Sequence, residues 1–132
     1  MARLGTIDPR GRPHLVPISF TLVDDVAYSA VDSKPKTTRR LQRVANIERE
    51  PRASLLVDHY DEDWTTVWWC FVTGRARVVY EGKEFDNAVR ALADKYEQYE
   101  GNPPAGPAVV LEIDRWRGWY SAPGGSGVPP GR

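Results

Sequence analysis

Alternation of apolar and polar residues predicts several short strands along this chain. Within residues 14–22, Ile18, Phe20 and Leu22 are separated by polar residues, as expected for a strand with one buried face. Pro17 in the same stretch has no backbone N–H to donate, so this strand should lie at a sheet edge or contain an irregularity. Five more stretches have the apolar and β-branched content of strands: residues 3–7, 26–31, 53–60, 65–80 and 108–113, the last able to continue through 116–120.

Turn residues separate these stretches. Residues 8–12, Asp-Pro-Arg-Gly-Arg, place proline and glycine where a hairpin turn requires them. The acidic residues 61–63 form a turn between two strands, and Gly74 is expected to bend the longer of these strands. Proline and glycine also make residues 102–107 a loop. The sequence therefore predicts strands that are joined in antiparallel pairs.

The apolar period changes to three or four residues in two regions, which predicts two helices. The first begins near Thr38, has Thr37 or Thr38 available as an N-cap, and ends before Pro51. The second spans about residues 84–99. These helices do not alternate regularly with the strands, which disfavours a doubly wound parallel sheet. The predicted fold class is mainly β, an antiparallel barrel with helices beside it.

The chain has 132 residues, enough for one domain with its own core. We expect that domain to span residues 1–122 and residues 123–132 to be a disordered tail. Cys70 is the only cysteine, so no intrachain disulfide can form and a reducing, cytoplasmic location is expected. The longest apolar run is far shorter than the roughly 20 residues that cross a bilayer, and the start lacks the apolar segment of a signal peptide. No membrane role is expected.

Charge is balanced overall but unevenly distributed. The 18 basic and 18 acidic residues give a net charge of zero, which argues against binding to nucleic acid. Residues 34–43 contain five cations and no acid, whereas residues 58–63 contain four acids and no lysine or arginine. A basic patch on a neutral protein indicates a small anionic ligand more than a polyanion.

The residues Lys34-Pro35-Lys36-Thr37-Thr38 are the most distinctive short stretch of the sequence. Two ammonium groups and two hydroxyls stand directly before a predicted helix, whose free backbone amides carry partial positive charge. That combination is typical of a phosphate site. It is equally typical of a solvated loop that ends in an ordinary threonine cap, so both interpretations stay open on these residues alone.

Other chemistry has less support in the sequence. Cys70 lies in an apolar run and is expected to be a small buried residue. His14 and His59 are the only histidines and make no recognised metal-ligand spacing, so no metal site is expected. Five tryptophans can line an apolar cleft for a ring system or pack in a core or an interface. Trp68 and Trp69 point to opposite faces of a strand, so one of them needs cover, which a dimer interface would supply.

Several stretches of the sequence resemble a known family. Residues 4–18, Leu-Gly-Thr-Ile-Asp-Pro-Arg-Gly-Arg-Pro-His-Leu-Val-Pro-Ile, resemble the opening hairpin of the pyridoxamine-phosphate-oxidase-like split-barrel flavoproteins. Residues 30–36 and 58–64, Ala-Val-Asp-Ser-Lys-Pro-Lys and Asp-His-Tyr-Asp-Glu-Asp-Trp, resemble the actinobacterial branch associated with the deazaflavin coenzyme F420. The resemblance extends from Arg3 to about Ser121. Relatives usually have a helix before the first strand, whereas here the strand pattern begins at Arg3.

This resemblance implies a six-stranded antiparallel split β-barrel of the FMN-binding type. It also implies a homodimer with one cofactor in each of two interface clefts. By analogy residues 17–20 run beside the cofactor ring, the residues around Lys36 hold its phosphate, and Trp64, Trp68 or Trp119 closes the cleft from the partner subunit. The cofactor-binding residues implied in this way are Pro17, Ile18, Ser19, Phe20, Lys34, Lys36, Thr37, Thr38, Arg43, Asn46, Trp64 and Trp68, and no catalytic residue is assigned.

The function expected from the resemblance is that of a cytoplasmic F420-dependent oxidoreductase. It would transfer a hydride between the reduced deazaflavin and a small conjugated organic acceptor, and the cofactor ring, not a protein nucleophile, would carry the hydride. An FMN-dependent enzyme of the same fold is one alternative. The other is a protein that binds flavin, deazaflavin or haem without turnover. Tyr60, His59 and Tyr120 are conceivable proton donors by residue type alone.

Overall fold

The computed structural model describes residues 1–31, 41–122 and 125–127. These residues form one antiparallel sheet and two α-helices, so the prediction of a mainly β protein with flanking helices is confirmed. Along the sheet the strand order is β2-β1-β5-β6-β7-β4-β3, and β8 pairs with β7 beside this path. The strands are β1 (Ala2–Ile7), β2 (Pro13–Ile18), β3 (Thr21–Val23), β4 (Val26–Ala30), β5 (Arg52–His59), β6 (Trp68–Val79), β7 (Ala108–Ala122) and β8 (Gly125–Gly127). The helices are α1 (Gln42–Arg49) and α2 (Lys83–Lys95), with short 3₁₀ turns η1 (Trp64–Thr66) and η2 (Glu97–Tyr99).

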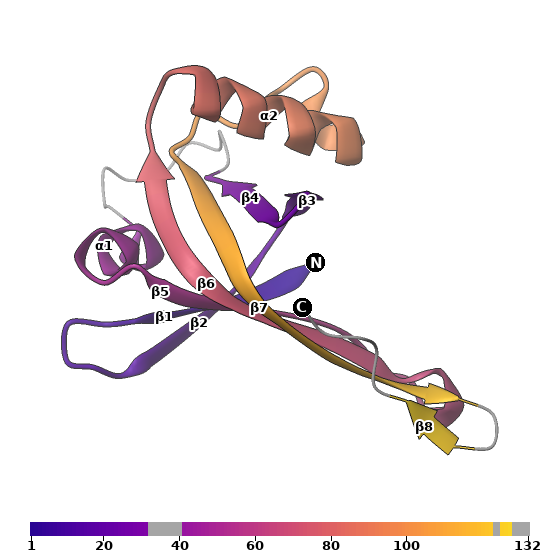
Figure 1. The fold of residues 1–132 in the computed structure, drawn as a ribbon. Coiled ribbons are helices and arrows are strands. Elements are labelled where there is room, and N and C mark those ends of the chain that lie inside the picture. Colours follow the sequence, from indigo (N-terminus) through magenta and orange to yellow (C-terminus); the bar gives the residue numbers. More distant parts are fainter. Residues whose placement is uncertain (32–40, 123–124, 128–132) are drawn as a thin grey trace.

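The prediction of six strands in a barrel is wrong in the strand count and in the closure. The main path has seven strands, and within the described residues its two edge strands, β2 and β3, do not pair with each other. The predicted strand over residues 14–22 is divided into β2 and β3. Figure 1 shows the result: β3 and β4 lie under α2, separated from the hairpin of β1 and β2.

The break between β2 and β3 has a clear physical cause. The backbone N–H of Phe20 donates to the hydroxyl of Tyr96 (3.1 Å), and that hydroxyl donates in turn to the carbonyl of Phe20 (3.0 Å). Lys95 Nζ donates to the same carbonyl (2.5 Å) and lies 3.9 Å from the centre of the Phe20 ring. Because Lys95 and Tyr96, at the C-terminal end of α2, satisfy the polar groups of Phe20, this residue takes no part in a strand ladder.

Replacement of Tyr96 by phenylalanine is expected to reduce the free energy of unfolding by about 1–2 kcal/mol, because the partly buried Phe20 amide loses its acceptor. Urea denaturation measures this difference. Tyr60→Phe is the matched control, since the Tyr60 side chain is 73% exposed and should tolerate the change. Equal stability of the two variants would mean that the Tyr96 hydroxyl does not stabilise the break between β2 and β3.

The predicted hairpin at residues 8–12 is confirmed. The N–H of Asp8 donates to the carbonyl of Arg12 (2.9 Å), and Gly11 adopts the positive φ of 79° that favours glycine. The Asp8 carboxylate accepts from the backbone N–H groups of Arg10 and Arg12. The hydrogen bond from the Arg12 backbone is the largest of several that lower the pKa of Asp8.

The helices are shorter than the sequence predicts. Helix α1 starts at Gln42, and its N-cap residue is Leu41, whose side chain makes no capping hydrogen bond, so the threonine cap is not found there. Helix α2 ends at Lys95 instead of continuing to residue 99. Tyr96 is extended, with φ −117° and ψ 114°, and its hydroxyl bonds Phe20, so a tertiary contact accompanies the early end of the helix.

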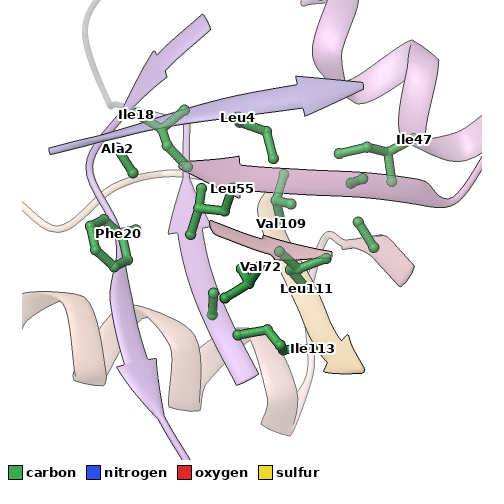
Figure 2. Close-up of a cluster of buried hydrophobic side chains, with 13 residues drawn as sticks. Ala2, Leu4, Ile18, Phe20, Ile47, Leu55, Val72, Val109, Leu111 and Ile113 are labelled. Atoms are coloured by element: carbon green, nitrogen blue, oxygen red, sulfur yellow. The ribbon is translucent and has the colours of Figure 1, made fainter. Parts of the chain in front are cut away.

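The core lies on one face of the sheet. Figure 2 shows part of it, with Leu4, Leu55 and Val72 of three adjacent strands facing Leu111 and Ile47. Helix α1 contributes Ile47, whereas α2 covers β3 and β4 and buries Ala88 and Leu92 (Figure 1). Strands β5, β6 and β7 continue together beyond this core as an arm whose end carries β8 (Figure 1).

The long strand β6 is irregular where the sequence predicts a bend. Its pairing register with β7 shifts between Thr73 and Gly74, which is a bulge or a similar irregularity. Thr73 pairs with Arg115 and Gly74 with Ile113, so the β7 strand has one extra residue at this point. The irregularity lies within the core region, since Val72 on one side of it and Ala76 on the other both belong to the core cluster.

Candidate functional site

Strand alternation gives the sheet a second face, opposite the core. Leu55 and Val72 belong to the core cluster, so their neighbours Leu56 and Phe71 project from the other side. We call this side the outer face. It consists of Arg3, Gly5 and Ile7 of β1, Leu15 and Pro17 of β2, Arg52, Ser54, Leu56 and Asp58 of β5, Trp69, Phe71 and Thr73 of β6, and Arg115, Arg117 and Trp119 of β7.

A pocket of about 580 Å³ opens at the arm end of the sheet. Trp69 and Trp119 pair across β6 and β7 and form part of its wall on the outer face. We call it the aromatic pocket, because five of its nine lining residues are Trp or Tyr and a sixth, His59, stacks on Trp68. The lining residues are Leu56, Asp58, His59, Tyr60, Trp64, Val67, Trp68, Trp69 and Trp119.

The turn between β5 and β6 positions Trp64. Asp63 caps the 3₁₀ turn η1, where its carboxylate accepts from the backbone N–H (3.0 Å) and the hydroxyl (2.6 Å) of Thr65. These hydrogen bonds lower the pKa of Asp63. Trp64 remains 70% exposed, so the turn presents its ring to solvent at the pocket edge instead of burying it.

Two contacts hold the rest of the pocket wall. The His59 and Trp68 rings are stacked, with centroids 6.4 Å apart. The N–H of Ser121 donates to the carbonyl of Val67 (2.9 Å) and ties the end of the turn to β7. Trp68 and Trp69 are 40% and 38% exposed, so neither indole is buried within one chain.

A second hollow of about 700 Å³ lies on the outer face nearer the hairpin. Its floor contains Gly5, Ser54 and Thr73, which occupy one row across β1, β5 and β6. Arg52 and Arg75 lie opposite each other at one end of it. Small residues along a row leave the sheet surface hollow, so the outer face is open from the hairpin to the arm.

The structure separates the predicted site residues into several groups. Ile18 and Phe20 are buried in the core cluster, and Pro17 is exposed on β2. The carbonyl of Ser19 accepts from the hydroxyl of Ser29 (2.7 Å). Ring contact by residues 17–20 would therefore involve Pro17, Ser19 or the backbone, and not the side chains of Ile18 and Phe20.

The two predicted site residues of α1, Arg43 and Asn46, differ in burial. Asn46 is fully buried; its Nδ2 donates to Thr6 Oγ1 (3.0 Å), and its Oδ1 accepts from Gln42 (2.7 Å). The bond to Thr6 thus joins α1 to β1, and the bond from Gln42 lies within the first turn of α1. Arg43 is half-buried. The predicted phosphate residues Lys34, Lys36, Thr37 and Thr38 lie outside the described residues.

Trp64 and Trp68 are brought together in the aromatic pocket, and Trp119 lines it too. The sequence analysis counted Trp69 among five tryptophans able to line a cleft but not among the cofactor-binding residues, and it assigned neither Leu56 nor Val67 to the site. Alternation along β6 places Trp69 on the outer face, but only its pairing with Trp119, fifty residues later, shows that both rings line one hollow. Within one chain β1 and β5 lie between the strand of Pro17 and the strand of Trp68.

Neither a reactive cysteine nor a metal site is found among the described residues. Burial raises the pKa of the Cys70 thiol, which packs against the core and is a poor nucleophile in that state. Among the described residues no group of three or more His, Cys, Asp and Glu side chains is placed to hold a metal ion. None of the helices in this part of the chain has the length and apolar character needed to cross a membrane.

Comparison with solved structures identifies the fold. The conserved hypothetical protein Rv2991 of Mycobacterium tuberculosis has a TM-score of 0.71 at 22% identity, over 90% of this chain and 76% of that one. A heme binding protein of Mycobacterium smegmatis has a TM-score of 0.71 at 19% identity, over 96% of this chain and 51% of that one. A FAD-binding protein of Mesorhizobium loti has a TM-score of 0.65 at 18% identity, over 89% of this chain and 83% of that one. At these identities the likeness concerns the fold alone.

Comparison at the level of sequence gives the family. No protein with a curated description matches the chain. The family described as pyridoxamine 5'-phosphate oxidase matches residues 1–120, which include β1, both helices and nearly all of β7. The match thus covers both the core and the arm, and it confirms the split-barrel type of fold. The chain belongs to the pyridoxamine 5'-phosphate oxidase family.

Proposed function

We propose that this protein is an F420-dependent oxidoreductase that transfers a hydride between the reduced deazaflavin and a small conjugated acceptor. The observation that supports this most is the aromatic pocket, which is wide, open and walled by Trp64, Trp68, Trp69 and Trp119. Flat apolar side chains suit a planar tricyclic ring, because stacking and burial both favour it. The residues present therefore fit such a cofactor.

We further propose that the site is completed in a homodimer. Pro17 and the tryptophans of the arm lie on different parts of the outer face in one chain. A second copy of the chain can bring its own arm near the β2 edge of the first. The outer face also exposes Leu15 (71%) and leaves Trp69 38% exposed, and association would bury these apolar groups.

In this proposal the chain binds, orients and protects the cofactor. F420 supplies the hydride chemistry when it is bound. The tryptophan walls exclude water from one side of the ring, and Lys34, Lys36, Thr37 and Thr38 hold its phosphate ahead of α1. Within the described residues α1 has no side-chain cap, which leaves amides at its N-terminus for an anion.

Equilibrium binding tests the cofactor assignment. Purified protein is titrated with F420 and separately with FMN, cofactor fluorescence reports binding, and sedimentation velocity of the same samples gives the oligomeric state. Micromolar binding of F420 to a dimer, with FMN much weaker, is the expected result. Preference for FMN would instead identify a flavin enzyme of the same fold, and binding of neither would remove the proposal.

The double variant Lys34→Ala with Lys36→Ala is expected to bind F420 about tenfold more weakly, because two salt-screened charge-assisted contacts to phosphate are lost. Fluorescence titration at two salt concentrations measures the change, which should shrink as salt rises. Lys83→Ala, which removes one cation at the start of α2, is the control. Unchanged affinity of a folded double variant would remove the phosphate assignment.

Haem binding without turnover is the second candidate, and His59 favours it. The imidazole lies in the aromatic pocket, with 48% of its side chain exposed and Nε2 3.9 Å from an oxygen of Asp61. Imidazole nitrogen is a common axial ligand of haem iron, and apolar walls suit a porphyrin. Titration with haem should then give a shifted Soret band that His59→Ala abolishes, and an unchanged spectrum excludes this candidate.

A further inference from the structure

The walls of the aromatic pocket suit a cation better than an anion. Five of the nine lining residues are tryptophan or tyrosine, and none is lysine or arginine. The faces of aromatic rings carry partial negative charge, which attracts cations. Trp64, Trp68 and Trp69 are 70%, 40% and 38% exposed, so a ligand can reach these rings. The walls therefore favour a ligand that is both flat and positively charged.

A carboxylate lines the same pocket. Asp58 Oδ1 accepts from Arg3 (2.7 Å), whereas its other oxygen makes no hydrogen bond with a described residue. The Asp58 side chain is 33% exposed. Arg117 lies on the outer face two residues from Trp119, but neither Arg117 nor Arg3 lines the pocket. The lining thus contains one carboxylate with a free oxygen, and the arginines stand outside it.

The turn between β5 and β6 adds negative charge at the rim. Tyr60 and Trp64, which both line the pocket, flank three exposed acids, Asp61, Glu62 and Asp63. None of the three forms an ion pair with a lysine or arginine of the described chain, and Asp61 Oδ2 lies 3.9 Å from His59 Nε2. Uncompensated carboxylates raise the local concentration of cations over about 8–10 Å at moderate salt.

The second hollow of the outer face differs in charge. Two arginines, Arg52 and Arg75, are among its lining residues, together with the hydroxyl residues Ser54 and Thr73. Arg75 makes no hydrogen bond or ion pair with another described residue. An anionic group thus has better partners there than among the rings, and the ligand class of the aromatic pocket is set apart by charge.

We propose that the aromatic pocket binds a planar organic cation, and that the acceptor of the proposed reaction belongs to this class. The inference rests on the proposed function and narrows its acceptor to a conjugated C=N⁺ compound. An acceptor has to lie against the reacting ring, so it meets the same aromatic walls. Cation–π attraction to these walls and the acidic rim then select the charged acceptor over a neutral one of equal shape.

The charge of such an acceptor also suits the reaction. A C=N⁺ group takes the hydride on carbon and becomes a neutral amine, while the reduced deazaflavin loses that hydride and one proton and is oxidised. The product no longer carries the charge that the pocket favours. It therefore binds more weakly than the acceptor and is released.

Calorimetry of the protein without cofactor compares a matched pair of probes. N-methylacridinium is a planar cation that accepts a hydride on carbon, and acridine has nearly the same rings but is neutral at mildly alkaline pH. N-methylacridinium should bind about tenfold more tightly than acridine, because cation–π attraction adds to stacking. Equal affinity of the two probes would overturn the cation preference.

Fluorinated tryptophan tests whether the rings supply this preference. Protein produced with fluorotryptophan in place of all five tryptophans keeps the shape of the walls, while fluorine withdraws negative charge from the ring faces. The affinity for N-methylacridinium should fall several-fold, and that for acridine should change little. An equal change for both probes would assign the binding to stacking alone and contradict the inference.

Removal of the rim charges tests the contribution of the turn. The variant Asp61→Asn with Glu62→Gln should bind N-methylacridinium about threefold more weakly, an effect that shrinks as salt rises. With reduced F420 as donor, the same variant should raise KM for this cation and leave kcat unchanged. Asp86→Asn with Asp94→Asn, which removes two exposed charges from α2, is the matched control and should change neither value.

Two results separate this inference from the proposed function. If the protein binds F420 but binds N-methylacridinium no more tightly than acridine, the acceptor class is wrong and the oxidoreductase proposal remains. If it prefers N-methylacridinium but does not bind F420, the cation site stands, and the acceptor role is overturned together with the proposed cofactor.

Discussion

Replacing Gly74 by alanine is expected to reduce the free energy of unfolding by about 3 kcal/mol or more. An added Cβ would overlap the backbone oxygen of Glu112 and would lie 2.9 Å from its carbonyl carbon and 3.0 Å from the Cα of Ile113. These are backbone atoms of β7 and cannot rotate away. The strands must move apart at the bulge, which strains the hydrogen bonds on which both the core and the arm depend. Urea denaturation of the purified variant measures the loss.

Two other glycines provide controls for this prediction. A Cβ at Gly101 meets nothing within 4 Å, so Gly101→Ala should be neutral or slightly stabilising. A Cβ at Gly5 would lie 3.3 Å from Cδ2 of Leu15, an exposed side chain that can move, so Gly5→Ala should cost far less than Gly74→Ala. If Gly74→Ala were as stable as Gly101→Ala, the inference that the β6 and β7 backbones approach closely at the bulge would be wrong.

Gly74 also shows what local sequence can indicate about this fold. A lone glycine inside an apolar strand pattern predicts a bend, and the pairing register does shift there. Pro17 similarly predicts an edge or an irregularity, and β2 is an edge strand that ends one residue later. The division of residues 14–22 into two strands was not predictable, because its cause is Tyr96, which lies 76 residues from Phe20.

The candidate site was predictable to a smaller extent. The tryptophan content indicates an aromatic cleft, and Trp64 and Trp68 do line one pocket. Trp119 comes from β7, and only the long-range register shows that it lies beside Trp69. Helical spacing likewise puts Arg43 and Asn46 one turn apart, but it cannot show that Asn46 bonds Thr6 on β1. Local sequence patterns cannot predict side-chain contacts between residues that are distant in sequence.

Substitution of Trp64 by alanine is expected to weaken F420 binding about 100-fold, equivalent to about 2.7 kcal/mol, because one aromatic wall of the pocket is lost. The fold should persist, since the indole is 70% exposed and the capping hydrogen bonds of Asp63 involve Thr65 and Thr66. Titration followed by cofactor fluorescence measures the affinity, because the tryptophan signal itself changes in this variant. Sedimentation of the same sample shows whether the variant retains the wild-type oligomeric state.

Tyr80→Ala is the matched control, since Tyr80 is an exposed aromatic residue (56%) just beyond the opposite end of β6. Its loss removes a hydrogen bond to Glu48 at 3.1 Å but no part of the aromatic pocket. Trp64→Phe should recover much of the lost affinity, because a smaller flat ring still covers the cofactor. A folded Trp64→Ala variant with wild-type affinity would place the cofactor elsewhere, and haem titration of that variant would then show whether His59 and Trp68 serve a different ligand.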